Sequence, residues 1–238
     1  MCNLKVIYFK EMKSYFNSPM AYIFLFVFAV VSGYFFTSPF FLIGQSDLRG
    51  LFSIIPLLYI ILIPAITMGM VSRDWNIGTM EIMTTLPITD YEYIIGKFLS
   101  SITIILTSLA FSIVHILTVY RFGTEIDTGA IICGYFGLIL LGTFYSSIGI
   151  FASSLTDNQV YALLTSFGIV LLFFMMDKVL IFVPSPTIAG LMQYMSVDFH
   201  LSNISRGVLD TRNIIYFLSM SFLFINLSVR SLESRRWR

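Results

Sequence analysis

Apolar residues dominate the chain in long blocks that contain no charged side chain. In the 238-residue sequence these blocks cover positions 14–46, 50–72, 98–120, 128–156, 158–176, 179–197 and 213–229. A helix that crosses a bilayer needs about 20 mainly apolar residues, and six of the blocks meet or nearly meet that length. The seventh, 179–197, contains Pro184, Pro186 and Gly190. Because proline removes a backbone donor and interrupts regular helix, we predict an irregular segment there.

The pattern therefore predicts an all-α polytopic membrane protein with six transmembrane helices. Their expected ranges are 20–37, 51–71, 98–120, 129–154, 159–177 and 213–229. These ranges divide a single transmembrane domain, residues 1–238, into the following parts: an N-terminal segment 1–18, spans one and two within 20–71, a loop 72–97, spans three to five within 98–177, an outer lobe 178–212, span six at 213–229, and a basic tail 230–238.

Residues 3–17 are amphipathic on a helical wheel. One arc carries Leu4, Tyr8, Phe9, Met12, Tyr15 and Phe16, and the other carries Lys10, Glu11, Lys13, Ser14 and Asn17. This division is typical of a helix that lies in the membrane interface, and Ser18-Pro19 ends it before the first span. The alternative is a frayed tail beside the membrane.

Composition excludes several other classes of protein. Apolar residues make up 57% of the chain and charged residues only 11%, against about 25% charged in an average soluble domain. A soluble fold cannot hide so much apolar surface, and disordered chains are poor in apolar residues. The net charge of +1 argues against a nucleic-acid binder. Two cysteines, Cys2 and Cys133, do not make a disulfide scaffold or, with two distant histidines, a metal site.

Lysine and arginine set the expected orientation, because cytoplasmic loops are enriched in them. With six spans, both termini lie on one side, and that side has nine of these residues against five on the other. Both termini are therefore expected in the cytoplasm, where the tail 234–238 can contact anionic lipid head groups. The nine are Lys5, Lys10, Lys13, Arg73, Lys97, Arg230, Arg235, Arg236 and Arg238, and the five are Arg49, Arg121, Lys178, Arg206 and Arg212.

The longest cytoplasmic connection, residues 72–97, reads SRDWNIGTMEIMTTLPITDYEYIIGK. Its first half predicts a short helix around 75–83 with one apolar face, made of Trp75, Ile77, Met80, Ile82 and Met83. Thr89 and Glu92 have the spacing of a capping box that starts the next helix. Apolar residues outside the membrane need a covering surface. That surface is either a cytoplasmic partner protein or the bilayer itself.

The same loop resembles the coupling region of the ABC-2 family of ATP-binding-cassette permeases. The resemblance rests on Arg73, Gly78-Thr79, Glu81, Pro87 and Gly96-Lys97, with Asp74 where the family often has glutamate. Two further stretches, KEMKSYFNSPMAY at 10–22 and ISRGVLDTRNIIYF at 204–217, resemble the permease associated with bacterial gliding motility. The three motifs stand in the family's order and extend the resemblance over nearly the whole chain.

The resemblance implies a type V exporter-like fold in the bacterial inner membrane. Its loop would dock on a separate ATPase subunit that binds ATP and Mg, and the chain would pair with a second permease chain or with an auxiliary extracytoplasmic membrane protein, as a homo- or heterodimer. Two short, partly re-entrant helices are implied between spans five and six, which we assign to 191–194 and 199–208. The implied ATPase-coupling residues are Arg73, Asp74, Trp75, Gly78, Thr79, Glu81, Met83, Pro87, Gly96 and Lys97.

The chain itself has no phosphate-binding loop. Gly96-Lys97 is followed by Phe98 rather than by serine or threonine, and position 91 is Tyr91 rather than glycine. We therefore expect no cofactor and no catalytic activity in this chain. ATP hydrolysis by a partner would then drive export or mechanical work on an extracytoplasmic partner.

Small and polar residues mark three further places. Small residues share one face of the fourth span, predicting a helix-packing seam or a sliding surface. His115, inside the third span, is a functional candidate or a neutral, hydrogen-bonded side chain. The outer lobe offers charged residues for an auxiliary protein, for lipid head groups or for solvent alone. The seam comprises Gly142, Ser146, Gly149 and Ser153, and the outer charges are Arg206, Asp210 and Arg212.

Two other functions compete with the permease. A passive channel or structural anchor would not need the patterned loop 72–97. An intramembrane enzyme would need a catalytic constellation, and His115 has no carboxylate at i±3 or i±4. The composition of the spans, poor in charge and rich in Phe, Leu, Ile and Met, does not identify the cargo, since ordinary lipid-facing helices have the same composition. A lipid, a polysaccharide, a peptide and a protein all stay open.

Overall fold

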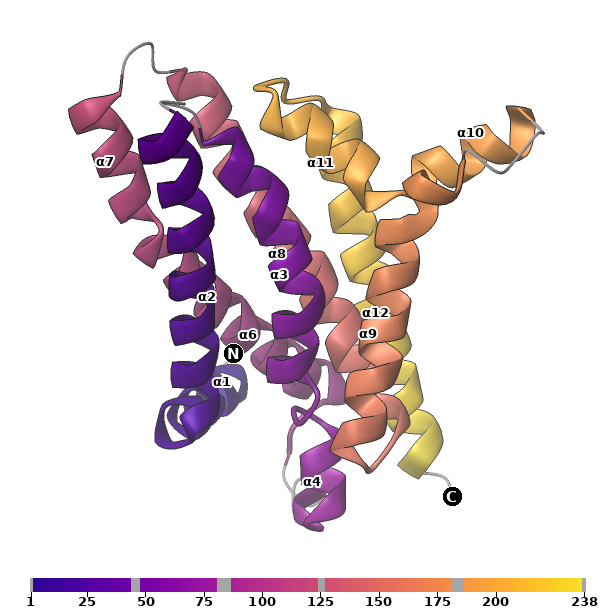
Figure 1. Cartoon of the computed structure of the whole chain (residues 1–238). Helices are drawn as coiled ribbons and strands as arrows, with labels where there is room; N and C mark the ends of the chain where they lie inside the picture. Colours follow the sequence, from indigo (N-terminus) through magenta and orange to yellow (C-terminus); the bar gives the residue numbers. More distant parts are fainter. Residues whose placement is uncertain (1, 44–47, 81–86, 124–126, 181–185, 237–238) are drawn as a thin grey trace.

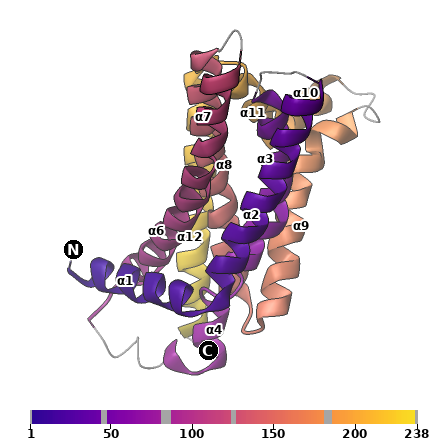
Figure 2. The same ribbon diagram turned by 60° about the vertical axis from the view of Figure 1, so that its left-hand side comes forward.

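A computed structural model of the chain is a bundle of long helices, with one helix lying across its base (Figures 1 and 2). The structure describes residues 2–43, 48–80, 87–123, 127–180 and 186–236, and these contain no β-strand. The elements are α1 Cys2–Asn17, α2 Pro19–Thr37, a π-helical turn η1 Ser38–Ile43, α3 Arg49–Thr67, α4 Ser72–Asn76, α6 Asp90–Phe111, α7 Ile113–Phe122, α8 Thr128–Leu155, α9 Gln159–Val179, α10 Pro186–Met195, α11 Val197–Ser205 and α12 Thr211–Arg236.

Six helical stretches of the described residues are long and apolar enough to cross a membrane, as the charge pattern predicts. The third begins at Asp90 rather than at 98, because the Thr89–Glu92 capping box starts α6 there: Glu92 N donates to Thr89 Oγ1 at 3.2 Å, and Thr89 N donates to Glu92 Oε2 at 3.2 Å. The sixth helix continues to Arg236, so most of the predicted basic tail is helical.

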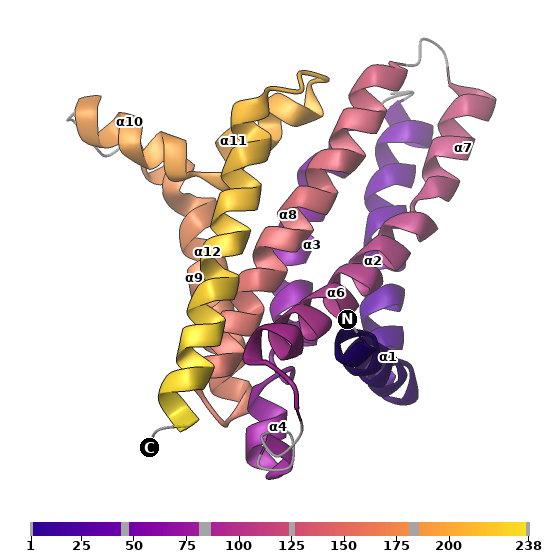
Figure 3. The same cartoon turned by 180° about the vertical axis from the view of Figure 1, so that it is seen from behind.

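Helix α8 forms the centre of the bundle, with α3, α9 and α12 packed around it (Figure 3). Of its most apolar stretch 72% is buried, against 28% for the first and fifth spans, so those outer spans keep most of their surface exposed. At mid-height the Phe144 ring contacts the rings of Phe173, Phe217 and Phe224, with centroids 5.4–6.3 Å apart. These contacts join α8 to α9 and α12.

The small residues of α8 contact two neighbouring helices. A Cβ added to Gly142 would lie 2.9 Å from Ile105 Cγ2 on α6, and one added to Gly149 would overlap Thr67 Oγ1 on α3. Ser153 Oγ accepts from the backbone N–H groups of Val71 and Ser72, both at 3.0 Å. Ser146 is buried as well. These short approaches are the close packing that small residues permit in lipid.

The outer lobe differs from the sequence prediction. We predicted an irregular segment over 179–197, which is wrong for 186–195, because α10 is regular there. Pro186 is its first residue, where the missing N–H costs nothing. Instead of helices at 191–194 and 199–208, the structure has α10 at 186–195 and α11 at 197–205, and Gly207 with φ +89° follows α11. At 10 residues, α10 is too short to cross a bilayer.

The contact between α8 and α3 gives a first prediction. Gly149→Ala should lower the midpoint of thermal unfolding of the detergent-solubilised chain, because the added methyl group overlaps Thr67 and overpacking costs about 1–3 kcal/mol. Gly168→Ala on α9 is the matched control, since nothing lies within 4 Å of its added Cβ. Equal midpoints for the two variants would contradict the close α3–α8 packing.

Candidate functional site

The loop between the second and third spans forms a short protrusion at the base of the bundle, labelled α4 in Figure 1. Helix α4 ends at Asn76, and Gly78, with φ +73°, reverses the chain. The helix predicted around 75–83 is interrupted by a turn at 77–78. Residues 75–76 and 79–80 are helical, and 81–83 lie outside the described residues. Ile77 is 59% exposed whereas Met80 is 2% exposed, so the predicted apolar face is split.

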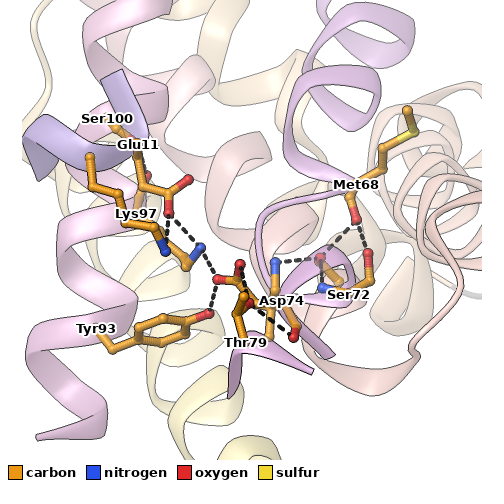
Figure 4. A network of polar contacts seen from close by, with 11 residues as sticks. Glu11, Met68, Ser72, Asp74, Thr79, Tyr93, Lys97 and Ser100 are labelled. Carbon is orange, nitrogen blue, oxygen red and sulfur yellow. Dashed lines mark hydrogen bonds and ion pairs between the residues drawn. The ribbon is translucent and has the colours of Figure 1, made fainter. Parts of the chain in front are cut away.

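Lys97 is the centre of a buried polar network that joins three elements (Figure 4). Its Nζ lies 2.7 Å from Asp74 Oδ2 on α4 and 2.8 Å from Glu11 Oε1 on α1. Tyr93, one turn before Lys97 on α6, donates its hydroxyl to Asp74 Oδ2 at 2.6 Å. The Lys97 side chain is only 1% exposed, so one buried cation holds two carboxylates from elements far apart in sequence.

Asp74 is fixed from its other side by the turn that follows α4. Thr79 Oγ1 lies 3.1 Å from Asp74 Oδ1 and 3.2 Å from the Asp74 carbonyl oxygen, within hydrogen-bond distance of both. The aspartate thus contacts Lys97, Tyr93 and Thr79. Desolvating a carboxylate is costly unless hydrogen bonds and an opposite charge replace the lost water, and this carboxylate has both.

Helix α1 packs closely on α6, which places Glu11 beside Lys97. A Cβ added to Gly96 would lie 2.8 Å from Ile7 Cγ2, so glycine is needed at that approach. Tyr15 donates its hydroxyl to the Ile66 carbonyl oxygen at 2.9 Å, and burial raises the pKa of this phenol, which keeps it a donor. These contacts support an ordered α1 rather than the frayed alternative.

Glu11 departs from its sequence assignment. The helical wheel placed it on the polar arc, yet it is buried together with Ile7 and Tyr15, while Phe9 of the apolar arc is 60% exposed. Glu11 and Tyr93 are the two network residues that the sequence-based set of coupling residues missed. The i, i+4, i+8 spacing of Ile7, Glu11 and Tyr15 puts all three on one face, but this spacing alone does not show that the face packs against α6.

The C-terminal end of α12 contacts α4 from the opposite side. The Arg235 guanidinium lies 5.1 Å from the Trp75 ring centroid, and its Nη1 lies 2.6 Å from Asp157 Oδ1 in an ion pair without good hydrogen-bond alignment. Ser231 Oγ donates to the Ser154 carbonyl oxygen at 3.1 Å. Arg235, predicted as part of a lipid anchor, thus links α12, α4 and the turn between α8 and α9.

The remaining predicted coupling residues are scattered. Arg73 and Gly78 are exposed, and the Pro87 carbonyl oxygen accepts from Asn3 Nδ2 at 2.9 Å. Glu81 and Met83 lie outside the described residues. Among the described coupling residues, the structure therefore brings Asp74, Thr79, Gly96 and Lys97 together near α1. Arg73 and Gly78 stay on the surface, and Trp75 lies against α12.

The candidate residues elsewhere are not joined to this network. Arg206, Asp210 and Arg212 are exposed, and Asp210 Oδ1 accepts from the Arg212 N–H at 2.9 Å, which caps the start of α12. The His115 ring packs 4.7 Å from the Phe36 ring. No group of three or more His, Cys, Asp or Glu in the described part of the chain could hold a metal ion.

Six apolar spans, of which α8 is the central one, and the Lys97 network where three elements meet at one end define a polytopic integral membrane protein. The sequence model of the ABC-2 family transporter protein matches residues 5–201. The chain therefore belongs to this family, which comprises membrane permease components of ABC transporters. No curated protein sequence matches the chain at a significant level.

The Lys97 network gives a second prediction. Lys97→Met should lower the free energy of unfolding by about 3–5 kcal/mol, because it leaves the Glu11 and Asp74 carboxylates without their buried cation. The triple variant Glu11→Gln, Asp74→Asn, Lys97→Met should recover at least half of that loss, since all three side chains are then neutral. Denaturant unfolding of the detergent-solubilised chain measures both. Equal losses in the two variants would show that uncompensated charge is not the cause.

Proposed function

We propose that this chain is the transmembrane permease subunit of a bacterial ABC transporter, coupled to a separate ATPase subunit below α4. The observation that carries the proposal is the Lys97 network, which connects α4 to α6 and α1. In it, Lys97 Nζ lies 2.7 Å from Asp74 Oδ2 and 2.8 Å from Glu11 Oε1. In this arrangement both termini lie in the cytoplasm of a plasma-membrane protein. ATP and Mg are bound by the ATPase, and this chain is not an enzyme.

The proposed docking surface consists of Asn76, Ile77 and Gly78, the exposed residues that follow Trp75. Ile77, at 59% exposure, is the apolar anchor, since an apolar side chain that projects from the membrane domain gains most from a protein partner. Glu81 and Met83 remain proposed members of the surface on the family resemblance alone.

Motion of α4 would reach the spans by three routes. Asp74 and Lys97 carry it to α6 and, through Glu11, to α1. Ser153, which accepts from two backbone N–H groups at the start of α4, carries it to α8. Arg235 carries it to α12. Rigid elements joined by buried polar contacts move together, which is the repertoire of hinge and shear motions in transporters.

The wider assembly follows from the family resemblance. We propose a type V exporter-like dimer with a second permease chain, identical or different, and an auxiliary extracytoplasmic membrane protein as in the gliding-associated group. Helices α10 and α11 would be the partly re-entrant pair, with the exposed Arg206, Asp210 and Arg212 available to the auxiliary protein. The work done would be export or mechanical action on that protein.

A third prediction tests the docking surface. Ile77→Asp should abolish co-purification of an ATP-binding-cassette ATPase with the tagged full chain, because a charge replaces the apolar anchor. Val208→Asp is the matched control, since Val208 is 60% exposed beyond the end of α11. Both variants should keep the wild-type unfolding midpoint.

Retention of the ATPase by Ile77→Asp would overturn this docking surface. Flux of solute through liposomes that contain only this chain, without the ATPase or ATP, would favour the passive channel instead.

A fourth prediction tests the route through α12. Arg235→Ala should leave the ATPase bound but lower the stimulation of its hydrolysis by the permease several-fold, because it removes a cation–π contact of about 0.5–2 kcal/mol and an ion pair. Arg230→Ala, an exposed position on the same helix, should leave stimulation unchanged. A loss of binding in Arg235→Ala would instead make Arg235 part of the docking surface, contrary to its position against Trp75.

A further inference from the structure

A cavity of about 210 Å³ lies beside the Lys97 network, where α1 meets α3, α4 and α9. Its polar wall includes Lys10, Ser14, Arg73 and Gln159, and Lys97 forms part of its floor. The cavity is smaller than the roughly 300–1,000 Å³ of typical small-molecule pockets. It can therefore take a compact group rather than a whole extended ligand.

The polar groups around the cavity have capacity to bind a further partner. Arg73, Ser14 and Gln159 make no side-chain hydrogen bond or ion pair within the part of the chain that the structure describes. Lys10 Nζ lies 3.8 Å from Glu11 Oε1, whereas Lys97 Nζ lies 2.8 Å from the same oxygen. Donors from α1, α4 and α9 thus face one space, and the nearby carboxylate is already held by Lys97.

The charge around the cavity favours an anion. Lys10, Arg73 and Lys97 supply three positive charges, and Glu11 and Asp74 two negative charges, which leaves a net charge of +1. Both carboxylates contact Lys97 at 2.7–2.8 Å. The guanidinium of Arg73, and the ammonium of Lys10 with its longer 3.8 Å contact to Glu11, are therefore the cations with capacity for an anion. Guanidinium and ammonium groups that converge with neutral donors are the usual partners of phosphate.

The position of the cavity indicates which kind of molecule carries that phosphate. Met20, at the start of the first span, and Ile66, near the end of α3, line its apolar side, so the space borders the membrane-spanning helices. Helix α1 crosses the base of the bundle (Figure 2), and its Val6 and Phe9 are at least 60% exposed. This is the level at which lipid head groups meet a membrane protein.

We propose that this cavity binds the phosphate of an anionic phospholipid from the cytoplasmic leaflet. The head group would bridge Lys10 on α1 and Arg73 on α4, the same two elements that Lys97 joins, and so hold α4 in position. The cytoplasmic assignment rests on the orientation given under the proposed function. This moves Arg73 from the set of ATPase contacts to the lipid site.

Native mass spectrometry of the full chain measures the binding directly. The delipidated chain is titrated with dioleoyl phosphatidylglycerol or with dioleoyl phosphatidylcholine, and we expect preferential retention of phosphatidylglycerol. Lys10→Gln, Arg73→Gln should weaken that retention about tenfold, the equivalent of about 1.4 kcal/mol. The control Arg121→Gln, Arg212→Gln removes the same charge from exposed positions at the other end of the spans and should change nothing. Excess sn-glycerol 3-phosphate should not displace the lipid.

Several outcomes would overturn the lipid site. These are equal retention of the two lipids, equal effects of the two double variants, or displacement by sn-glycerol 3-phosphate, which would show a site for a soluble phosphate. In the co-purification assay used for Ile77→Asp, loss of the ATPase subunit by the Lys10→Gln, Arg73→Gln variant, with its lipid preference unchanged, would also do so, because Lys10 and Arg73 would then serve an acidic protein surface. The binding assay contains no ATPase, so its result is independent of whether the docking surface at Ile77 is correct.

Discussion

A single buried ammonium group constrains the base of this protein. Lys97 contacts Glu11 and Asp74, lies 4.8 Å from the centroid of the Tyr93 ring, and is almost completely hidden from solvent. Removing three charges from water costs free energy, and this cost is offset only when the opposite charges are in contact. The position of α1, the position of α4 and the register of α6 therefore depend on one another. Displacing any one of them leaves a buried charge without its partner.

The membrane-spanning part is held by a different kind of contact. Lipid is as apolar as the side chains that face it, so helices in a bilayer gain little from the hydrophobic effect and associate through close packing. Gly142 and Gly149 of α8 allow that packing against α6 and α3. The packing at Gly142 and Gly149 depends on shape, whereas the Lys97 contacts depend on charge. The two kinds of contact meet at Ser153, where α8 accepts hydrogen bonds from the first residues of α4.

The charge pattern predicted the six spans because a charge in the bilayer core is costly enough to leave a visible gap in sequence. The Thr89–Glu92 capping box was predictable for a similar reason, since its geometry is local. The Lys97 network was predictable only in part. The family resemblance indicated Asp74 and Lys97, but the helical wheel assigned Glu11 to the polar face of its helix. A helical wheel shows which residues share a face and not which face meets another helix. Burial of Glu11 depends on Lys97, 86 positions away, and no local pattern encodes that contact.

The polar nature of the Lys97 network bears on how force could pass through it. A joint of apolar side chains near the membrane surface could exchange its contacts for lipid at little cost, and α4 could then shift without moving the spans. Asp74 and Glu11 have no such substitute, because only Lys97 offers each of them a buried cation among the described residues. Moving α4 alone would separate these charges, which costs free energy. Moving α1 and α6 together with α4 keeps the contacts and therefore costs less. The outer helices α10 and α11 have no polar contact with this network in the described structure, so motion would reach them through the packed faces of α8, α9 and α12.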